Sequence, residues 1–177
     1  MIQLKRCTVR DIPEIRNVAL QSYEEHYLYL WTAPRFADWY MDRSFSEANL
    51  TAQFQEPNAH FYLVYWNEKM VGFIKLNWYK ALPGDAAAHS LELERIYLIN
   101  EVSGKGVGTE VLNEIINSCL LQGVHIIWLK SMDSSDSVFF YQKRGFEITA
   151  KETLPFEGFK DEYRTLLTMR RLLKKEE

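Results

Sequence analysis

The chain is predicted to be an α/β protein, in the broad sense that includes α+β folds, with a mixed central sheet and helices on both faces. Strand-like segments of alternating apolar residues are separated by amphipathic helical segments, and two helices, 106–122 and 135–144, each link consecutive strands. The chain has 177 residues, of which 47% are hydrophobic, so it can bury a substantial core. Residues 1–177 carry no internal repeat or low-complexity stretch and are expected to form one domain.

The first half of the chain shows clear helix-start signals. Asp11 before Ile12 and Pro13 predicts an N-cap followed by a proline in the first helical turn, Pro34 starts a second helix, and Ser46 caps a third. Two apolar segments around a short polar turn at 67–69 predict a hairpin of antiparallel strands. The expected elements are strand 2–7, helix 11–24, a helix from 34, helix 46–55, and strands 60–66 and 70–79.

The second half alternates strands with helices. The helix over 106–122 is supported by apolar residues at helical spacing, and Gly123 supplies its C-cap. The expected elements are strand 90–99, helix 106–122, strand 124–130, helix 135–144, and strands 146–153 and 163–171.

A glycine-rich turn joins strand 90–99 to helix 106–122. The glycines at 104, 106 and 108 can leave successive backbone N–H groups pointing at one ligand, and the positive end of the helix dipole adds to them. Such a turn suits a phosphate or pyrophosphate. Its GxGxG spacing matches neither a P-loop nor a dinucleotide fingerprint, and a tight strand-to-helix turn without a ligand is the alternative interpretation.

The chain resembles the GNAT superfamily of acyl-CoA-dependent N-acyltransferases in the order of its elements: a strand, a GxGxG turn, a helix, a strand and a short helix that ends in FYQKRGF. The resemblance covers nearly the whole chain and is strongest over 90–148, where SGKGVG corresponds to (R/Q)GxGxG and SSDSVFFYQKRGF to NxxAxxFYxKxGF. Ser103 and Ser134 depart from the usual Arg or Gln and the usual Asn. The segments SLELERIYL, FYLVYWNEKMVGFIKLN and FSEANL are most similar to PaiA-type polyamine (spermidine/spermine) N-acetyltransferases.

The resemblance implies a mostly antiparallel sheet in which the two strands flanking the phosphate helix splay apart and hold acetyl-CoA as co-substrate. It places the pantetheine arm against the backbone of strand 90–99 and the pyrophosphate on the glycine turn. Ser134 and Ser137 either contact the pantetheine or cap a helix, Lys105 either binds phosphate or is solvated, and Lys143 is within reach of the phosphates. The expected cofactor-binding residues are Ile96, Tyr97, Leu98, Ser103, Gly104, Lys105, Gly106, Val107, Gly108, Thr109, Ser134 and Ser137.

Acetylation of an amine requires removal of a proton, because an amine resembling lysine has a pKa of about 10.4. The resemblance assigns Glu94 as the proton acceptor and Tyr141, the tyrosine of the FYxKxGF motif, as the acid for the departing thiolate. Glu92 lies on the same strand face as Glu94, and either carboxylate is a candidate for the base. The alternative interpretations are a polar strand face for the two glutamates and a core aromatic for Tyr141.

The acceptor amine is expected to bind beside the first two helices. Carboxylates and aromatic faces suit an amine cation, and the expected substrate-binding residues are Glu25, Tyr29, Trp31 and Glu92, with Glu24, Tyr27 and Trp78 as further candidates. Aromatic residues at this density also occur in cores and on dimer surfaces, so a homodimer is a second interpretation of them.

Composition argues against several other classes. Net charge is −3 with interspersed charges, which excludes the broad basic face of a nucleic-acid partner. No apolar run approaches the roughly 20 residues of a membrane span and the N-terminus does not read as a signal peptide, so a soluble cytoplasmic protein is expected. Cys7 and Cys119 are expected as buried free thiols, and the four histidines show no metal-ligand spacing.

The leading expectation is a transferase: an acetyl-CoA-dependent N-acetyltransferase that passes acetyl directly to a primary amine of a small molecule, with a polyamine as the first class to test. One alternative is a protein N-terminal or lysine acetyltransferase. The other is a noncatalytic acyl-CoA-binding sensor.

Overall fold

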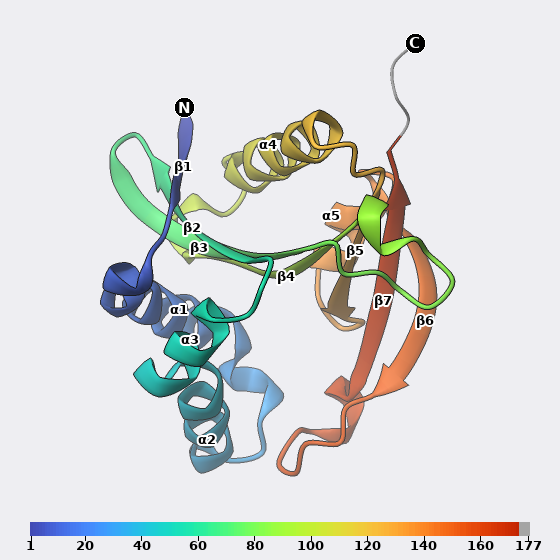
Figure 1. The fold of residues 1–177 in the computed structure, drawn as a ribbon. Coiled ribbons are helices and arrows are strands. Elements are labelled where there is room, and N and C mark those ends of the chain that lie inside the picture. Colours follow the sequence, from blue (N-terminus) through green and yellow to red (C-terminus); the bar gives the residue numbers. More distant parts are fainter. Residues whose placement is uncertain (174–177) are drawn as a thin grey trace.

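The computed structural model describes residues 1–173 and is built on a single seven-stranded sheet (Figure 1). The strands are β1 (Ile2–Arg6), β2 (Ala59–Trp66), β3 (Lys69–Trp78), β4 (Ser90–Leu98), β5 (Ile126–Met132), β6 (Glu147–Thr153) and β7 (Thr165–Leu172). Their order across the sheet is β1-β2-β3-β4-β5-β7-β6. Only β4 and β5 pair in parallel and every other neighbouring pair is antiparallel, which confirms the mixed, mostly antiparallel sheet.

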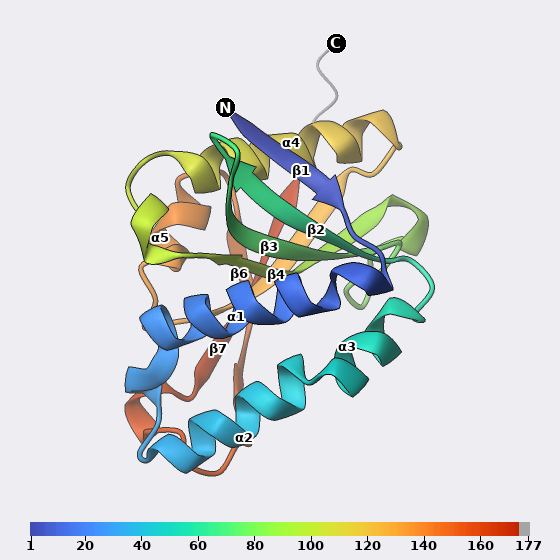
Figure 2. The ribbon, with the colours of Figure 1, turned by 90° about the vertical axis from the view of Figure 1, so that its left-hand side faces the viewer.

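Helices cover both faces of the sheet, as predicted. They are α1 (Ile12–Tyr27), α2 (Pro34–Phe45), α3 (Glu47–Phe54), α4 (Val107–Leu121) and α5 (Ser137–Gln142). Figures 1 and 2 show α1, α2 and α3 on one side of the sheet, with α4 and α5 on the other. No helix within residues 1–173 has both the length and the apolar character that a bilayer crossing requires.

The helix starts follow the predicted signals with one exception. The Ser46 hydroxyl accepts a hydrogen bond from the backbone N–H of Asn49 at 3.4 Å, so it caps α3 as expected. Asp11 does not cap α1, because its carboxylate accepts from the Thr8 N–H at 2.8 Å and the Lys5 ammonium at 2.7 Å. These bonds stabilise the short 3₁₀ turn that precedes α1, so the predicted cap was assigned one turn too late.

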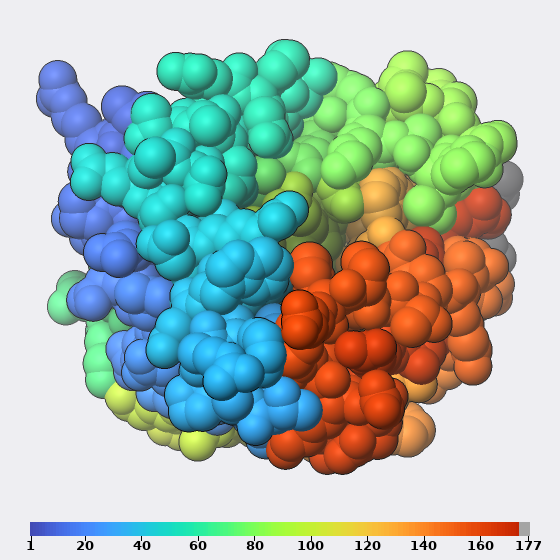
Figure 3. Space-filling view, turned by 90° about the horizontal axis from the view of Figure 1, so that it is seen from below, coloured from blue at the N-terminus to red at the C-terminus, as the bar shows by residue number. Residues whose placement is uncertain are grey.

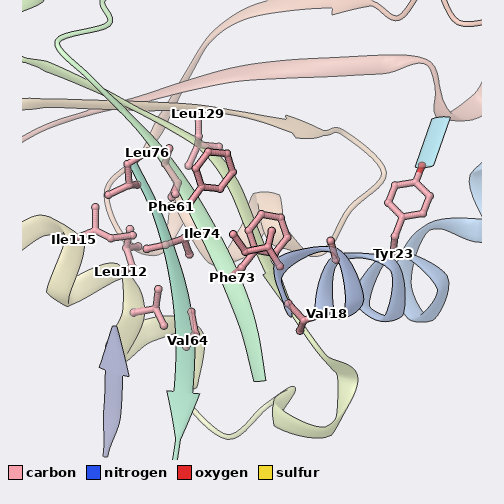
Figure 4. Close-up of a cluster of buried hydrophobic side chains, with 14 of the residues drawn as sticks. Val18, Tyr23, Phe61, Val64, Phe73, Ile74, Leu76, Leu112, Ile115 and Leu129 are labelled. Carbon is pink, nitrogen blue, oxygen red and sulfur yellow. The ribbon is translucent and has the colours of Figure 1, made fainter. Parts of the chain in front are cut away.

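The centre of the sheet is buried on both faces, because β3 lies between the two helical layers. Consecutive side chains of a strand point to opposite faces, and in Figure 4 Ile74 points toward Leu112 of α4 while Phe73 lies beside Val18 of α1. All four side chains are almost fully excluded from solvent. At Gly72 only a glycine fits, because an added Cβ would lie 2.2 Å from the Tyr97 carbonyl oxygen.

The connection between β6 and β7 folds back onto the segment between α1 and α2. Thr32 donates a backbone hydrogen bond to Gly158 at 2.8 Å, and Lys160 donates one to Leu30 at 2.9 Å. Between these bonds the Trp31 ring packs on Phe159 with centroids 4.2 Å apart. Figure 3 shows the orange residues of this connection directly against the blue α2 region. The C-terminal hairpin is therefore fastened to the N-terminal helices.

Candidate active site

Strands β4 and β5 separate halfway along their length. They pair only from Ser90 with Ile126 to Glu92 with Trp128. Beyond this point β4 continues to Leu98 alongside β3, and β5 continues to Met132 alongside β7. The second half of β4 therefore has no strand partner on its β5 side within the described residues, and the predicted splayed pair is present.

A cavity of about 980 Å³ occupies the gap. It is bordered by α1, the second half of β4, the glycine turn, α5 and the β6–β7 connection. The predicted site residues that line it are Tyr29, Glu94, Ile96, Tyr97, Leu98, Ser103, Gly104, Gly106, Gly108, Thr109, Ser134, Ser137 and Tyr141. Predicted residues outside the lining are Glu25, Trp31, Glu92, Lys105 and Val107, along with the further candidates Glu24, Trp78 and Lys143. The structure thus brings most of the expected cofactor and catalytic residues into one space.

The glycine turn has the form of an anion cradle. Gly104 and Gly106 adopt positive φ angles of 72° and 81°, and a Cβ added at either would meet nothing within 4 Å. Within the described part of the chain, no acceptor is recorded for the backbone N–H groups of Gly104, Gly106, Val107 and Gly108. Open space beside four free donors at a helix N-terminus fits the pyrophosphate of coenzyme A. The Val107 side chain is fully buried, so only its backbone N–H could contact a ligand here.

Arg144 is a cavity residue that sequence reasoning missed. Its guanidinium stacks 3.7 Å from the Phe140 ring centroid, donates to the Phe140 carbonyl at 2.9 Å and donates to the Thr109 hydroxyl in the first turn of α4. Its Nε is buried with no recorded acceptor among the described residues. The sequence signal for Arg144 was the second basic residue of YQKRGF, but the residue predicted to reach the phosphates was the first, Lys143.

Two other predicted polar contacts differ from expectation. The Lys105 ammonium lies 5.3 Å from the Trp66 ring centroid, outside the cavity lining. The capping bond expected of Ser134 belongs to Ser135, whose hydroxyl accepts from the Ser137 N–H at 3.2 Å. Ser137 also shares a hydrogen bond of 2.7 Å with Ser131. These hydroxyls form a small polar network at the start of α5.

A β-bulge places two consecutive residues of β4 on one face. Leu76 pairs with Leu93 and Lys75 pairs with Arg95, so Glu94 is the extra residue in β4. Glu94 contacts Lys75, whereas the Arg95 guanidinium lies 5.1 Å from the Phe45 ring centroid in α2, on the same side of the sheet. The bulge thus turns Glu94 into the cavity with a cation directly beside it.

The Glu94 carboxylate is held by three donors. It lies 2.9 Å from the Lys75 ammonium, 2.6 Å from the Asn77 side-chain amide and 3.5 Å from the Arg95 Nε. Burial raises the pKa of Glu94, but the opposing effect of Arg95, Lys75 and Asn77 is larger, so its pKa lies below the ordinary value. Glu94 is therefore ionised at neutral pH.

Lys75 is the second residue that sequence reasoning missed. Its side chain is 3% exposed, and besides Glu94 its ammonium lies 3.3 Å from the Glu56 carboxylate and 3.1 Å from the Gln53 side-chain oxygen, both from the α3 region. A lysine inside the apolar run VGFIKLNW was the available signal. A buried cation in such a run needs acidic partners.

The acidic residues expected to bind substrate are engaged elsewhere. Glu92 is buried, 2.5 Å from both the Asn77 amide and the Lys80 ammonium, and it shares the face of Glu94 as predicted. The Glu25 carboxylate accepts from the backbone N–H of Asn100 at 2.6 Å. These partners explain why neither carboxylate lines the cavity.

The two expected aromatic substrate residues behave differently. Trp31 is buried and donates its indole N–H to the Tyr23 hydroxyl at 2.9 Å. Tyr29 lines the cavity mouth, is 46% exposed, and contacts Tyr163 with ring centroids 5.2 Å apart. Of the four expected substrate residues, Tyr29 is thus the one within the lining.

Tyr141 lines the cavity and is also part of the core. Its ring packs on Phe140 and Phe146 with centroid separations of 5.1 and 5.4 Å. Burial raises the pKa of Tyr141, and Tyr27 nearby raises it further. The phenol is therefore protonated at neutral pH and can donate a proton. The two interpretations of this residue, cavity acid and core aromatic, are compatible.

No cysteine is found among the described residues that line the cavity. Cys7 and Cys119 are both buried, and burial raises the pKa of each thiol to about 12. Residues 1–173 also contain no group of three or more histidine, cysteine, aspartate or glutamate side chains placed to hold a metal ion.

Comparison with known proteins agrees with this geometry. Residues 17–146 match the model of the acetyltransferase (GNAT) family. An uncharacterized N-acetyltransferase of Lactobacillus delbrueckii subsp. lactis is 19% identical over 145 residues, which are 81% of this chain and 83% of the relative. The crystal structure of the PaiA N-acetyltransferase from Thermoplasma acidophilum in complex with coenzyme A is similar, with a TM-score of 0.73, 20% identity, and coverage of 97% of this chain and 99% of that one.

The fold is shared with enzymes of differing acceptors. The ribosomal-protein-S18-alanine N-acetyltransferase of Escherichia coli has a TM-score of 0.68 at 16% identity, with coverage of 100% of this chain and 97% of that one. The protein is an N-acetyltransferase, and acetyl-CoA is its co-substrate. On the match to nearly three quarters of its length, the chain belongs to the acetyltransferase (GNAT) family.

Proposed function

We propose that the enzyme transfers acetyl directly from acetyl-CoA to a primary amine of a small molecule. The observation that carries this proposal is a single cavity that contains the anion cradle, the ionised carboxylate of Glu94 and the protonated phenol of Tyr141. Direct transfer is favoured over a covalent enzyme intermediate because neither cysteine lines the cavity.

The chain offers a complete set of donors for the co-substrate. The free N–H groups of the glycine turn would hold the pyrophosphate, and the backbone of β4 that faces away from β3, at Ile96 and at the Leu98 N–H, would pair with the amides of the pantetheine arm. The Leu98 carbonyl already accepts from the Ser22 hydroxyl at 3.0 Å and lies 3.1 Å from the His26 Nε2. Arg144 adds a guanidinium beside Thr109 in the same cavity that Ser103, the residue in place of the usual Arg or Gln, also lines. Bound acetyl-CoA supplies an activated thioester.

Glu94 is proposed to accept the proton of the amine, directly or through water. Its lowered pKa makes it a weak base, so the proton is expected to move as the nitrogen bonds to carbon and becomes more acidic. Tyr141 is proposed to donate its proton to the departing thiolate, because its protonated phenol lines the same cavity. Its raised pKa makes it a weak acid, so the proton is expected to move only as negative charge builds on the sulfur. Both residues act as general acid–base groups and neither forms a covalent bond.

A small acceptor is supported by the β6–β7 connection, which is fastened to the N-terminal helices at one end of the cavity. A protein acceptor requires an open groove at this end. The resemblance to PaiA-type enzymes makes polyamines the first class to test. A noncatalytic sensor is the least supported alternative, because it would not need Glu94 and Tyr141 in the same cavity.

The test is acetyl-CoA-dependent thiol release, with the acetylated product identified by mass spectrometry, across small amines, polyamines, amino acids and lysine-containing peptides. We expect saturable turnover of small amines with one acetyl group added for each thiol released. Turnover restricted to peptides would replace the small-molecule proposal by the protein acetyltransferase. Coenzyme binding without any acetylated product would favour the sensor.

A further inference from the structure

One end of the cavity is bounded by an aromatic wall. The wall is formed by six rings that line the cavity: Tyr23, Tyr27, Tyr40, Tyr97, Phe156 and Phe159. They come from α1, α2, β4 and the β6–β7 connection, and ring contacts link them in the order Tyr97, Tyr27, Tyr23, Tyr40, Phe156 and Phe159.

The wall is uncharged. Burial raises the pKa of Tyr27 to about 12 and also raises the pKa values of Tyr23 and Tyr97. Their hydroxyl groups therefore stay neutral in the physiological range. Tyr23 and Tyr40 stack with centroids 5.2 Å apart, and Tyr40 meets Phe156 edge-on at 5.8 Å. A surface of this kind packs against apolar and aromatic groups, and although its ring faces can also attract an ammonium group, they supply no counter-charge for one.

Carboxylates facing the cavity are scarce. Among the described residues the acidic side chains in the lining are Glu94 and Asp136, and Asp136 lies with the serines at the start of α5, on the coenzyme side. Glu94 is already shared by two cations and one amide. Glu92 and Glu25 are bound to other groups outside the lining.

The charge balance near Glu94 opposes a second ammonium group. Arg95 lines the cavity beside Glu94, and Lys75 lies behind it. Spermidine carries several ammonium groups, of which only one can approach Glu94, and each of the others would lose its water without gaining a carboxylate. An arylalkyl monoamine carries a single ammonium group, and its ring can pack on the aromatic wall.

We infer that the acceptor is a monoamine with an aromatic or apolar body, and that polyamines are poor acceptors. This inference rests on the proposed function, since it names the substrate class of the same site.

The inference is tested by calorimetric binding of phenethylamine and spermidine to the coenzyme A complex of the full chain at equal ionic strength. We expect phenethylamine to bind tighter by about tenfold or more. Equal or tighter binding of spermidine would overturn the inference. Product formation is followed separately, so absence of acetylated amine contradicts the proposed function, whereas the order of binding decides the acceptor class.

Two variants test whether the acceptor amine binds against the aromatic wall. Phe156→Ala removes a ring from the aromatic wall and is expected to weaken phenethylamine binding by about tenfold without weakening spermidine. Phe139→Ala is the matched control, because Phe139 is 67% exposed and lies outside the cavity lining. Unchanged phenethylamine binding in a folded Phe156→Ala protein, or an equal loss in Phe139→Ala, would contradict the placement of the acceptor against the wall.

Discussion

Replacing Lys75 by methionine is expected to raise the pKa of Glu94 and to move the acid limb of activity with it. The Lys75 ammonium is 2.9 Å from the Glu94 carboxylate and its side chain is 3% exposed. At an effective dielectric constant of about 20, charges at this distance attract by about 6 kcal/mol before desolvation is subtracted. Carboxylates beside one cation show net pKa shifts of about 1–3 units. Because Arg95 and Asn77 remain, we expect a rise of about 1–2 units.

Two measurements report this change. NMR titration of the Glu94 carboxyl carbon, assigned by its loss in Glu94→Gln, gives the pKa directly. The pH dependence of kcat/KM should break at the same pH in each protein, because the ionised carboxylate is the active form. Lys75→Arg keeps the positive charge and serves as the control, with its break close to that of the wild type.

The free energy of unfolding of the Lys75→Met protein must be measured together with its activity. Removing one partner of a buried pair costs about 3–5 kcal/mol, and the low end is expected because the Glu94 side chain is 26% exposed and screened by solvent. Urea unfolding at neutral pH gives this value. If a folded Lys75→Met protein kept both the carboxyl titration and the pH break of the wild type, Lys75 would not control the pKa of Glu94.

Three further predictions concern other residues. Tyr141→Phe keeps the packing on Phe146 but removes the proton donor, so kcat should fall by about 10² or more with the coenzyme A Kd unchanged; an unchanged kcat would exclude Tyr141 as the acid. Arg144→Met should weaken coenzyme A about tenfold or more while pantetheine binding, measured by calorimetry, stays the same; equal losses for both ligands would contradict a phosphate contact. Burial and Arg6 lower the pKa of His60 to about 4 from 6.5. Between these two pH values the unfolded chain binds more protons than the folded one, so the free energy of unfolding should fall as pH drops from about 6.5 to about 4. His60→Gln should flatten this part of the stability curve, and a slope identical to that of the wild type would contradict the assignment.

Local patterns predicted all seven strands and the five α-helices of residues 1–173, although the strand expected at 124–130 runs over Ile126–Met132. Hydrophobic periodicity located the strands and long helices, Ser46 marked a helix start, and the glycine turn marked the anion cradle. Asp11 shows the limit of this approach, because the same residue can cap α1 or close the preceding 3₁₀ turn, and the choice depends on Thr8 and Lys5.

The electrostatics of the site could not be predicted from local patterns. A strict alternation along β4 places Glu94 and Arg95 on opposite faces, and the bulge that reverses this depends on pairing with β3. The same pairing brings Lys75 to Glu94 across the sheet, and Asn77 to both Glu92 and Glu94. Such contacts join residues far apart in sequence, so only the structure shows that the Glu92 and Glu94 carboxylates are already bound by other side chains.

The proposed function depends above all on proton acceptance by Glu94, which we would test first by measuring the turnover of a Glu94→Gln protein. Thiol release and acetylated amine are measured together over a range of pH, with the coenzyme A Kd determined by calorimetry. We expect kcat/KM to fall by about 10²–10⁴ near neutral pH, this defect to shrink as pH approaches the amine pKa of about 10, and the coenzyme A Kd to stay unchanged. Wild-type turnover by a folded Glu94→Gln protein would contradict proton acceptance by Glu94.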